Sequence, residues 1–192
     1  MKKMFYGYLL NKLTQKRLSS YQLAEKLSTT QKTAWFMLQR LRFLVENNFN
    51  NETFDGTTEI DETYYGGKEE NKHKHKKFTK QKDIIIGIVN RDTKKVKSQK
   101  VASTKYYYNH KTINHSAKEY VRENIHTNTI EGFFSLLKRT INGTYHFVSS
   151  KHLNKYLSEI NYRYNNKTSA CSKFIDITQN LVGRLKYREL IG

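Results

Sequence analysis

The sequence predicts an α+β fold, within the broad α/β class, in which helices flank a short antiparallel sheet. Apolar residues recur at helical spacing up to residue 50, and β-rich runs bounded by turn residues occupy 51–101. Helical spacing then returns from residue 125. The 192 residues include 14 Tyr, 10 Phe and 1 Trp, enough to bury one moderate core.

The charge balance indicates a polyanionic partner. Lys and Arg number 35 against 17 Asp and Glu, a net charge of +18 that costs self-repulsion in the folded chain. We therefore expect nucleic acid as the partner. No apolar run approaches the roughly 20 residues of a membrane span, so we expect no membrane and a cytoplasmic location. A single cysteine excludes a zinc ribbon, so any metal would have oxygen ligands.

Residues 19–47 predict two helices joined by a tight turn. Ser19 and Gln22 match a capping box that opens the first helix, and the polar stretch 28–30 interrupts it. The second helix has one apolar stripe, formed by Ala34, Leu38, Leu41 and Val45. This is the pattern of a helix-turn-helix.

A helix-turn-helix places the start of its second helix against DNA bases. Gln31, Lys32 and Thr33 are therefore the candidate base contacts, with Arg40 and Arg42 nearer the DNA backbone. A helical hairpin used only for packing is the alternative interpretation.

The segment 57–101 predicts a three-strand antiparallel meander. On its first strand Glu59 and Asp61 share one face, whereas Glu62 points to the other. A carboxylate within a sheet is unfavourable unless it is paired or bound to a metal. A solvated edge strand is the alternative.

The stretch 71–82 holds six lysines and two histidines and no acid. Facing DNA, it would add affinity that weakens with salt, and Lys72, Lys74, Lys76 and Lys77 are the candidate contacts. A solvated loop is the alternative.

Asn128 and Glu131 match a second capping box, at the start of a helix that Gly143 is expected to end. Glu131 and Lys138 share a face of this helix, which would suit a metal-ligating acid beside a lysine that steers phosphate. A simple cap and an ordinary solvated pair are the alternatives. Ser149 or Ser150 would cap one further helix, whose apolar face carries Leu153, Tyr156, Leu157, Ile160 and Tyr164.

Together these segments resemble bacterial insertion-sequence DDE transposases with an ISXO-type catalytic domain, over roughly residues 20–166. The resemblance rests on motifs at 60–68 (IDETYYGGK), 126–139 (HTNTIEGFFSLLKR), 142–146 (NGTYH), 150–153 (SKHL), Tyr156-Leu157 and 163–165 (RYN).

The resemblance implies an RNase H-like fold in which three acids bind two divalent ions, Mg²⁺ or Mn²⁺, to nick a transposon end and join it to target DNA. By position Asp61 is the first acid and Glu131 the third, both as metal ligands. Asn128 and Lys138 are supporting residues, and Arg139 is a DNA contact. The implied partners are the terminal inverted repeats, target DNA and further copies of the chain on DNA.

The sequence departs from the family pattern between the third strand and the segment 110–115, which resembles the family's fifth strand. Only residues 102–109 lie between them, too few for a helix and a fourth strand carrying the second acid. The five aspartates, at 55, 61, 83, 92 and 176, leave that position empty.

We therefore expect a transposase that is truncated internally and at its N-terminus and is catalytically impaired. Its expected regions are a helix-turn-helix over 1–50, an incomplete RNase H-like domain over 51–166 and a helical tail over 167–192. A sequence-specific DNA-binding protein without chemistry is the alternative. A general RNA-binding protein is less favoured, because the sequence contains no RNP-like or Gly-X-X-Gly element.

Overall fold

The computed structural model describes residues 18–49, 54–66, 82–103, 128–166 and 188. They group into two units, one with 18–49 and 139–166 and the other with 54–66, 82–103 and 128–138. The expected mixture of helices with a small antiparallel sheet is confirmed. The expected tail apart from Arg188, the stretch with Lys72, Lys74, Lys76 and Lys77, and the segment 104–127 lie outside the described residues.

The second unit contains the predicted meander. Strands β1 (Thr58–Tyr65), β2 (Asp83–Asn90) and β3 (Val96–Val101) form an antiparallel sheet in the order β1-β2-β3. In the register, Asp61 of β1 lies opposite Gly87 of β2, and Gly87 lies opposite Ser98 of β3. Residues paired in this way point to the same face, so these three share one side of the sheet.

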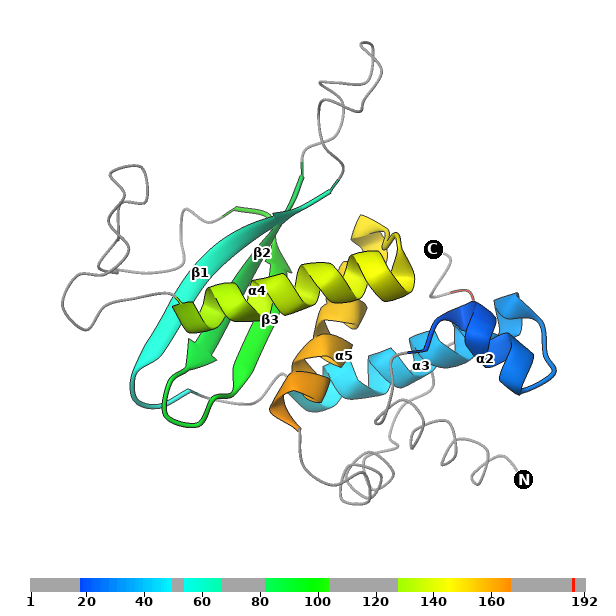
Figure 1. Cartoon of the computed structure of the whole chain (residues 1–192), viewed down its shortest axis with the longest axis horizontal. Helices are drawn as coiled ribbons and strands as arrows, with labels where there is room; N and C mark the ends of the chain where they lie inside the picture. Colours follow the sequence, from blue (N-terminus) through cyan, green and yellow to red (C-terminus); the bar gives the residue numbers. More distant parts are fainter. Residues whose placement is uncertain (1–17, 50–53, 67–81, 104–127, 167–187, 189–192) are drawn as a thin grey trace, which may run out of the picture. The chain divides into compact units, whose positions relative to one another are not determined.

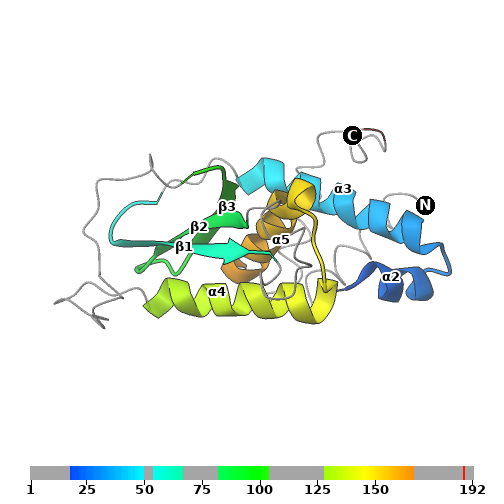
Figure 2. The same ribbon diagram turned by 90° about the horizontal axis from the view of Figure 1, so that it is seen from above.

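Helix α4 (Asn128–Thr140) lies across that side of the sheet (Figures 1 and 2). The strands bury Ile85, Val89 and Val96 there. The helix buries Ile130, Phe133, Phe134 and Leu137. Gly87 permits this close packing, because a Cβ at its position would lie 2.7 Å from Ile130 Cδ1 and 2.9 Å from the Phe134 ring.

The first unit is helical. Helix α2 (Ser20–Lys26) and helix α3 (Gln31–Phe49) are joined by a four-residue turn, and α3 also packs against α5 (Leu153–Asn165). The predicted capping box is confirmed, since the Gln22 amide donates to Ser19 Oγ at 3.2 Å and the Ser19 amide donates to Gln22 Oε1 at 3.1 Å. The predicted stripe is also confirmed: Ala34, Leu38, Leu41 and Val45 are all buried.

The connection from α4 to α5 differs from the prediction. Helix α4 gives way at Thr140 to a π-helical turn, η4 (Ile141–Tyr145), so Gly143 lies inside this turn and does not end the helix. A 3₁₀ turn, η5 (Ser150–His152), then leads into α5. The side chain of Ser149 makes no capping hydrogen bond within the described residues, and α5 is preceded by His152.

The space at Gly87 can be tested by substitution. We expect Gly87→Ala to lower the free energy of unfolding by about 1–3 kcal/mol, because the new methyl group must displace Ile130 and Phe134. Gly132→Ala is the matched control, since its Cβ meets nothing within 4 Å and alanine favours a helix by about 0.5–1 kcal/mol. Urea unfolding monitored by circular dichroism measures both, and equal effects of the two substitutions would contradict the packing described.

Candidate functional site

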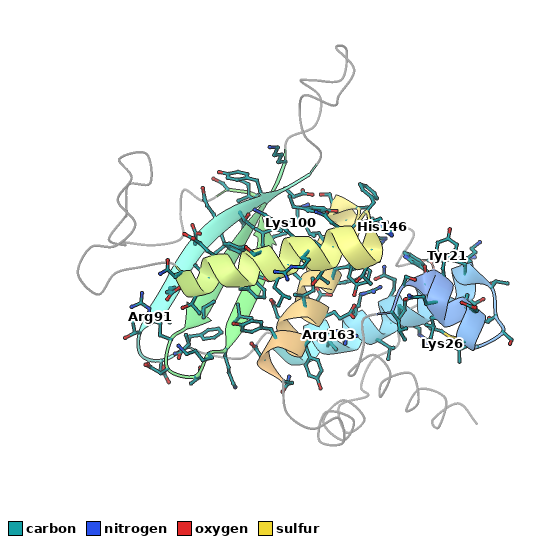
Figure 3. The ribbon with its side chains drawn as sticks, in the orientation of Figure 1. Tyr21, Lys26, Arg91, Lys100, His146 and Arg163 are labelled. Atoms are coloured by element: carbon teal, nitrogen blue, oxygen red, sulfur yellow. The ribbon has the colours of Figure 1, made fainter. Side chains whose placement is uncertain are left out.

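Glu59 joins the first turn of α4 to the sheet. Its side chain is 1% exposed, and Oε2 accepts hydrogen bonds from the amides of Thr129 and Ile130, both at 3.0 Å. Oε1 accepts from Arg91 Nε at 2.8 Å. A negative charge is favourable at a helix N-terminus, so this carboxylate both caps α4 and pairs with the cation. Figure 3 shows Arg91 beyond the end of β2, beside the beginning of α4.

The electrostatics of Glu59 follow from these contacts. Burial alone would raise the pKa of its carboxyl group, but the amide of Ile130, Arg91 and Thr129 together outweigh burial and lower that pKa. Glu59 is therefore ionised at neutral pH. The capping box predicted for Asn128 and Glu131 is wrong, because Asn128 is already helical and the amides after it bind Glu59.

Asp61 follows on the same face of β1, two residues after Glu59. It is half-buried opposite Gly87, the residue against which Ile130 packs, and its Oδ1 accepts from the Glu62 amide at 2.8 Å. Glu131 is exposed on α4, directly after Ile130. Asp61 therefore lies on the sheet face that α4 covers, and Glu131 lies in the first turn of α4 with its side chain exposed. Their roles as metal ligands stay predictions.

The other acid of the motif, Glu62, lies on the opposite face. It is exposed and its Oε1 accepts from the Tyr64 hydroxyl at 2.9 Å. This hydrogen bond raises the pKa of Tyr64. Glu62 therefore takes no part in the contact with α4.

A metal centre needs more ligands than this region displays. Among the described residues no group of three or more His, Cys, Asp or Glu side chains could hold a metal ion. The third carboxylate on this face, Glu59, has both oxygens occupied by Arg91 and the α4 amides. The acids that the structure describes therefore do not fit the ligand set of a two-metal site.

The remaining predicted residues of α4 lie on its surface. Asn128, Lys138 and Arg139 are all exposed. Lys138 falls two turns after Glu131, so the two lie along the same side of the helix. Their proposed roles stay predictions.

The predicted DNA contacts on α3 differ in their exposure to solvent. Lys32 and Thr33 are exposed, whereas the Gln31 side chain is half-buried and donates to Ser20 Oγ at 2.8 Å, which ties α3 to α2. Arg40 is half-buried, with its guanidinium 5.3 Å from the centre of the Phe36 ring. Lys32 and Arg40 both lie outside the buried stripe of the helix.

Arg42 is a correction to the sequence-based expectation. Instead of facing DNA it is buried, and its Nε donates to Glu159 Oε2 at 2.7 Å. Glu159 Oε1 also accepts from Arg163 Nε at 3.0 Å. The Arg42 guanidinium lies 3.8 Å from the centre of the Tyr156 ring. This arginine belongs to the core of the helical unit.

The pKa values of Glu159 and Arg42 show that this cluster stabilises the ionised form of both side chains. Burial alone would raise the pKa of Glu159, but Arg42 and Arg163 hold it at about 2. Burial alone would lower the pKa of Arg42, and the charge of Glu159 reverses that effect. The pair is therefore ionised throughout the neutral range.

Comparison with known proteins bears on the second half of the chain. Residues 102–165, a third of the sequence, match the sequence model of the ISXO2-like transposase domain. This segment is therefore similar in sequence to that transposase domain. The resemblance expected from the motifs is confirmed over these residues. No curated protein and no solved structure matches the chain.

The transposase match contains Asn128, Glu131, Lys138 and Arg139, together with the described parts of α4 and α5. Asp61 and the helices α2 and α3 lie outside it. No helix in the described ranges is long and apolar enough to cross a membrane.

Sequence reasoning missed Glu59, Arg91 and Glu159 as organising residues. The alternation on β1 did place Glu59 on the covered face, which is a signal that a buried acid needs a partner. Glu159 interrupts the apolar face of α5 just as Arg42 interrupts that of α3. Opposite charges inside two apolar stripes were the available signal for that pair.

The role of Glu59 predicts a pH-dependent loss of stability. We expect Glu59→Gln to lower the free energy of unfolding by about 2–4 kcal/mol at neutral pH, because Arg91 and the helix N-terminus lose their anion. The native pKa lies below the ordinary value of 4.5, so this stabilisation is complete above that pH. It is lost as the pH falls through the lowered native pKa.

The measurement is urea unfolding of the wild type and the variant from neutral to acidic pH. The two free energies should converge in acid. Glu62→Gln is the matched control, because that side chain is exposed on the other face and its removal should change stability little. A constant difference between Glu59→Gln and wild type at all pH values would contradict the ionic role.

Proposed function

We propose that this chain is a transposase-type protein that binds the DNA ends of an insertion sequence and is impaired in strand cleavage. The observation that carries the proposal is the transposase match at 102–165. The net charge of +18 supports a nucleic-acid partner independently of that match. End pairing would bring two or more copies of the chain together on DNA.

Recognition of the terminal repeats is assigned to α2, the turn and α3. The exposed Lys32 and Thr33 at the beginning of α3 support this, as does Arg40 outside the buried stripe. Gln31 is the weaker candidate because its side-chain amide already binds Ser20. Arg139 and the lysine-rich stretch 71–82 would add contacts to phosphate.

An RNase H-like arrangement is part of the proposal for the second unit. An antiparallel β1-β2-β3 sheet with α4 across one face supports it. In complete relatives, divalent ions held by clustered acids would polarise the reacting phosphodiester. Here Asp61 and Glu131 would correspond to two of the ligands for Mg²⁺ or Mn²⁺, which is fewer than such a site requires.

Impaired strand cleavage is supported by the contacts of Glu59, the other carboxylate on the covered face of the sheet. Glu59 is committed to Arg91 and to the α4 amides, so it is not free to replace a missing second acid. Occupation of transposon ends without chemistry is therefore the second candidate function. It requires the DNA-binding surface alone.

DNA binding should depend steeply on salt. With five or more phosphates neutralised, we expect affinity for a fluorescent duplex to fall roughly 10²- to 10⁴-fold between low and moderate salt. Lys32→Ala with Arg40→Ala should weaken binding and reduce the salt slope by about 2. The control is Lys94→Ala with Lys95→Ala, which removes equal charge from the exposed β2–β3 turn. The assignment would be contradicted if the DNA affinity measured by fluorescence anisotropy did not change with salt. Equal losses of affinity in the two double variants would also contradict it.

Cleavage should be absent or very weak. We expect no metal-dependent nicking of a labelled duplex that carries the element's terminal repeats when the protein is incubated with Mg²⁺ or Mn²⁺. Loss of one preorganised electrostatic contact already slows such reactions about 10²- to 10³-fold. Nicking that Asp61→Ala abolishes would show that another acid completes the site, and nicking that survives this substitution would contradict the assignment of Asp61.

A further inference from the structure

A pocket of about 530 Å³ opens within the helical unit. Its wall combines the beginning of α2, one side of α3, the η4 turn with the residues after it, and Tyr156 of α5. Small-molecule sites commonly have volumes of about 300–1,000 Å³, so the pocket can enclose a compact ligand. In Figure 3, Tyr21 on α2 and His146 after η4 mark two parts of this wall.

Two buried polar groups of the wall have no hydrogen-bond partner within the described part of the chain. They are Arg42 Nη1 and the Tyr145 hydroxyl. The Arg42 guanidinium lies 5.2 Å from the centre of the Tyr145 ring, and its positive charge acts to lower the pKa of the phenol. Burial, and then the charge of Glu159, raise the pKa of Tyr145, so its hydroxyl stays protonated at neutral pH. Both groups are therefore donors in need of an acceptor.

The same wall is rich in aromatic rings. Trp35 packs edge-on against His152 at 5.6 Å, and Tyr145 packs edge-on against Tyr156 at 4.8 Å. Tyr21 and Phe147, which also line the pocket, are each 74% exposed, a high value for large aromatic side chains. Exposed rings beside a pocket can stack on a flat ligand.

The backbone holds Phe147 in this position through a tight turn. The Phe147 amide donates to the Tyr145 carbonyl at 2.6 Å, and His146 between them has φ 59° and ψ −47°. A γ-turn with positive φ at a non-glycine residue is strained. The Phe147 ring that follows this turn lines the pocket and is exposed.

We infer that this pocket binds a nucleobase, either of a nucleotide or of an unpaired position in DNA. A base has flat faces for Tyr21, Trp35 and Phe147 and ring acceptors for Arg42 and Tyr145. A purely apolar ligand would leave both donors unpaired, and an inorganic anion would leave the aromatic faces exposed. The inference deepens the proposed function, and its DNA arm rests on that function, because a DNA-binding role supplies unpaired bases to this unit.

Trp35 makes the test specific, because it is the only tryptophan in the chain and it lines the pocket. We expect deoxyadenosine monophosphate to quench its fluorescence in a saturable way, since a stacked base perturbs the indole. Phe147→Ala or Tyr21→Ala should weaken the nucleotide roughly 5- to 100-fold, the usual effect of losing one stacking partner.

Tyr64→Ala is the matched control, since it removes a 53% exposed tyrosine from the outer face of β1 and should leave the titration unchanged. Circular dichroism would verify that each variant is folded. No quenching by nucleotide up to millimolar concentration, or the same affinity in wild type, Phe147→Ala and Tyr21→Ala, would overturn the inference.

The source of the base is resolved by comparing the mononucleotide with a single-stranded oligonucleotide and a fully paired duplex. Tighter, Phe147-dependent binding of the single strand assigns the pocket to unpaired DNA, and equal affinity assigns it to free nucleotide. Salt-dependent duplex binding without Trp35 quenching by any nucleotide would defeat this inference and leave the proposed function intact. Quenching by nucleotide with no duplex binding at any salt would defeat the proposed function instead.

Discussion

A carboxylate removed from water must recover its hydration energy from the protein, and this constraint organises both units. In the sheet unit, Glu59 exchanges water for Arg91 and two helix amides. In the helical unit, Glu159 exchanges water for Arg42 and Arg163. Because each carboxylate needs partners from separate elements, each one fixes the relative placement of those elements. If α4 shifted along the sheet, or α3 along α5, a buried charge would be left unpaired.

The features that sequence patterns predicted correctly are those decided within a few residues. The Ser19 and Gln22 cap, the Ala34 to Val45 stripe and the three-strand meander are all set by local spacing. The alternation on β1 also put Glu59 and Asp61 on one face before any partner was known. Local rules fail at the ends of α4, where Asn128 does not cap and Gly143 does not terminate the helix.

Partnerships between distant residues could not be predicted in the same way. Arg42 and Glu159 are 117 residues apart, and Glu59 is 71 residues from the Ile130 amide. An arginine in the second helix of a helix-turn-helix pattern suits either a DNA phosphate or a buried acid, and only tertiary packing decides between them. For the same reason the sequence could place Asp61 on a strand and Glu131 on a helix but could not show which acid binds the helix N-terminus.

The use of Glu59 as a structural anion bears directly on chemistry in the sheet unit. Its two oxygens hold the beginning of α4 at β1, and Glu131 lies one residue beyond the bonded Ile130 amide. The carboxylate that positions a candidate catalytic acid is thereby withdrawn from metal binding. A functional second acid must then come from a segment other than β1, because Glu62 lies on the opposite face. DNA occupation places no such demand, since it needs surface cations on a helix that is held in place, and the Arg42–Glu159 pair anchors α3 to α5.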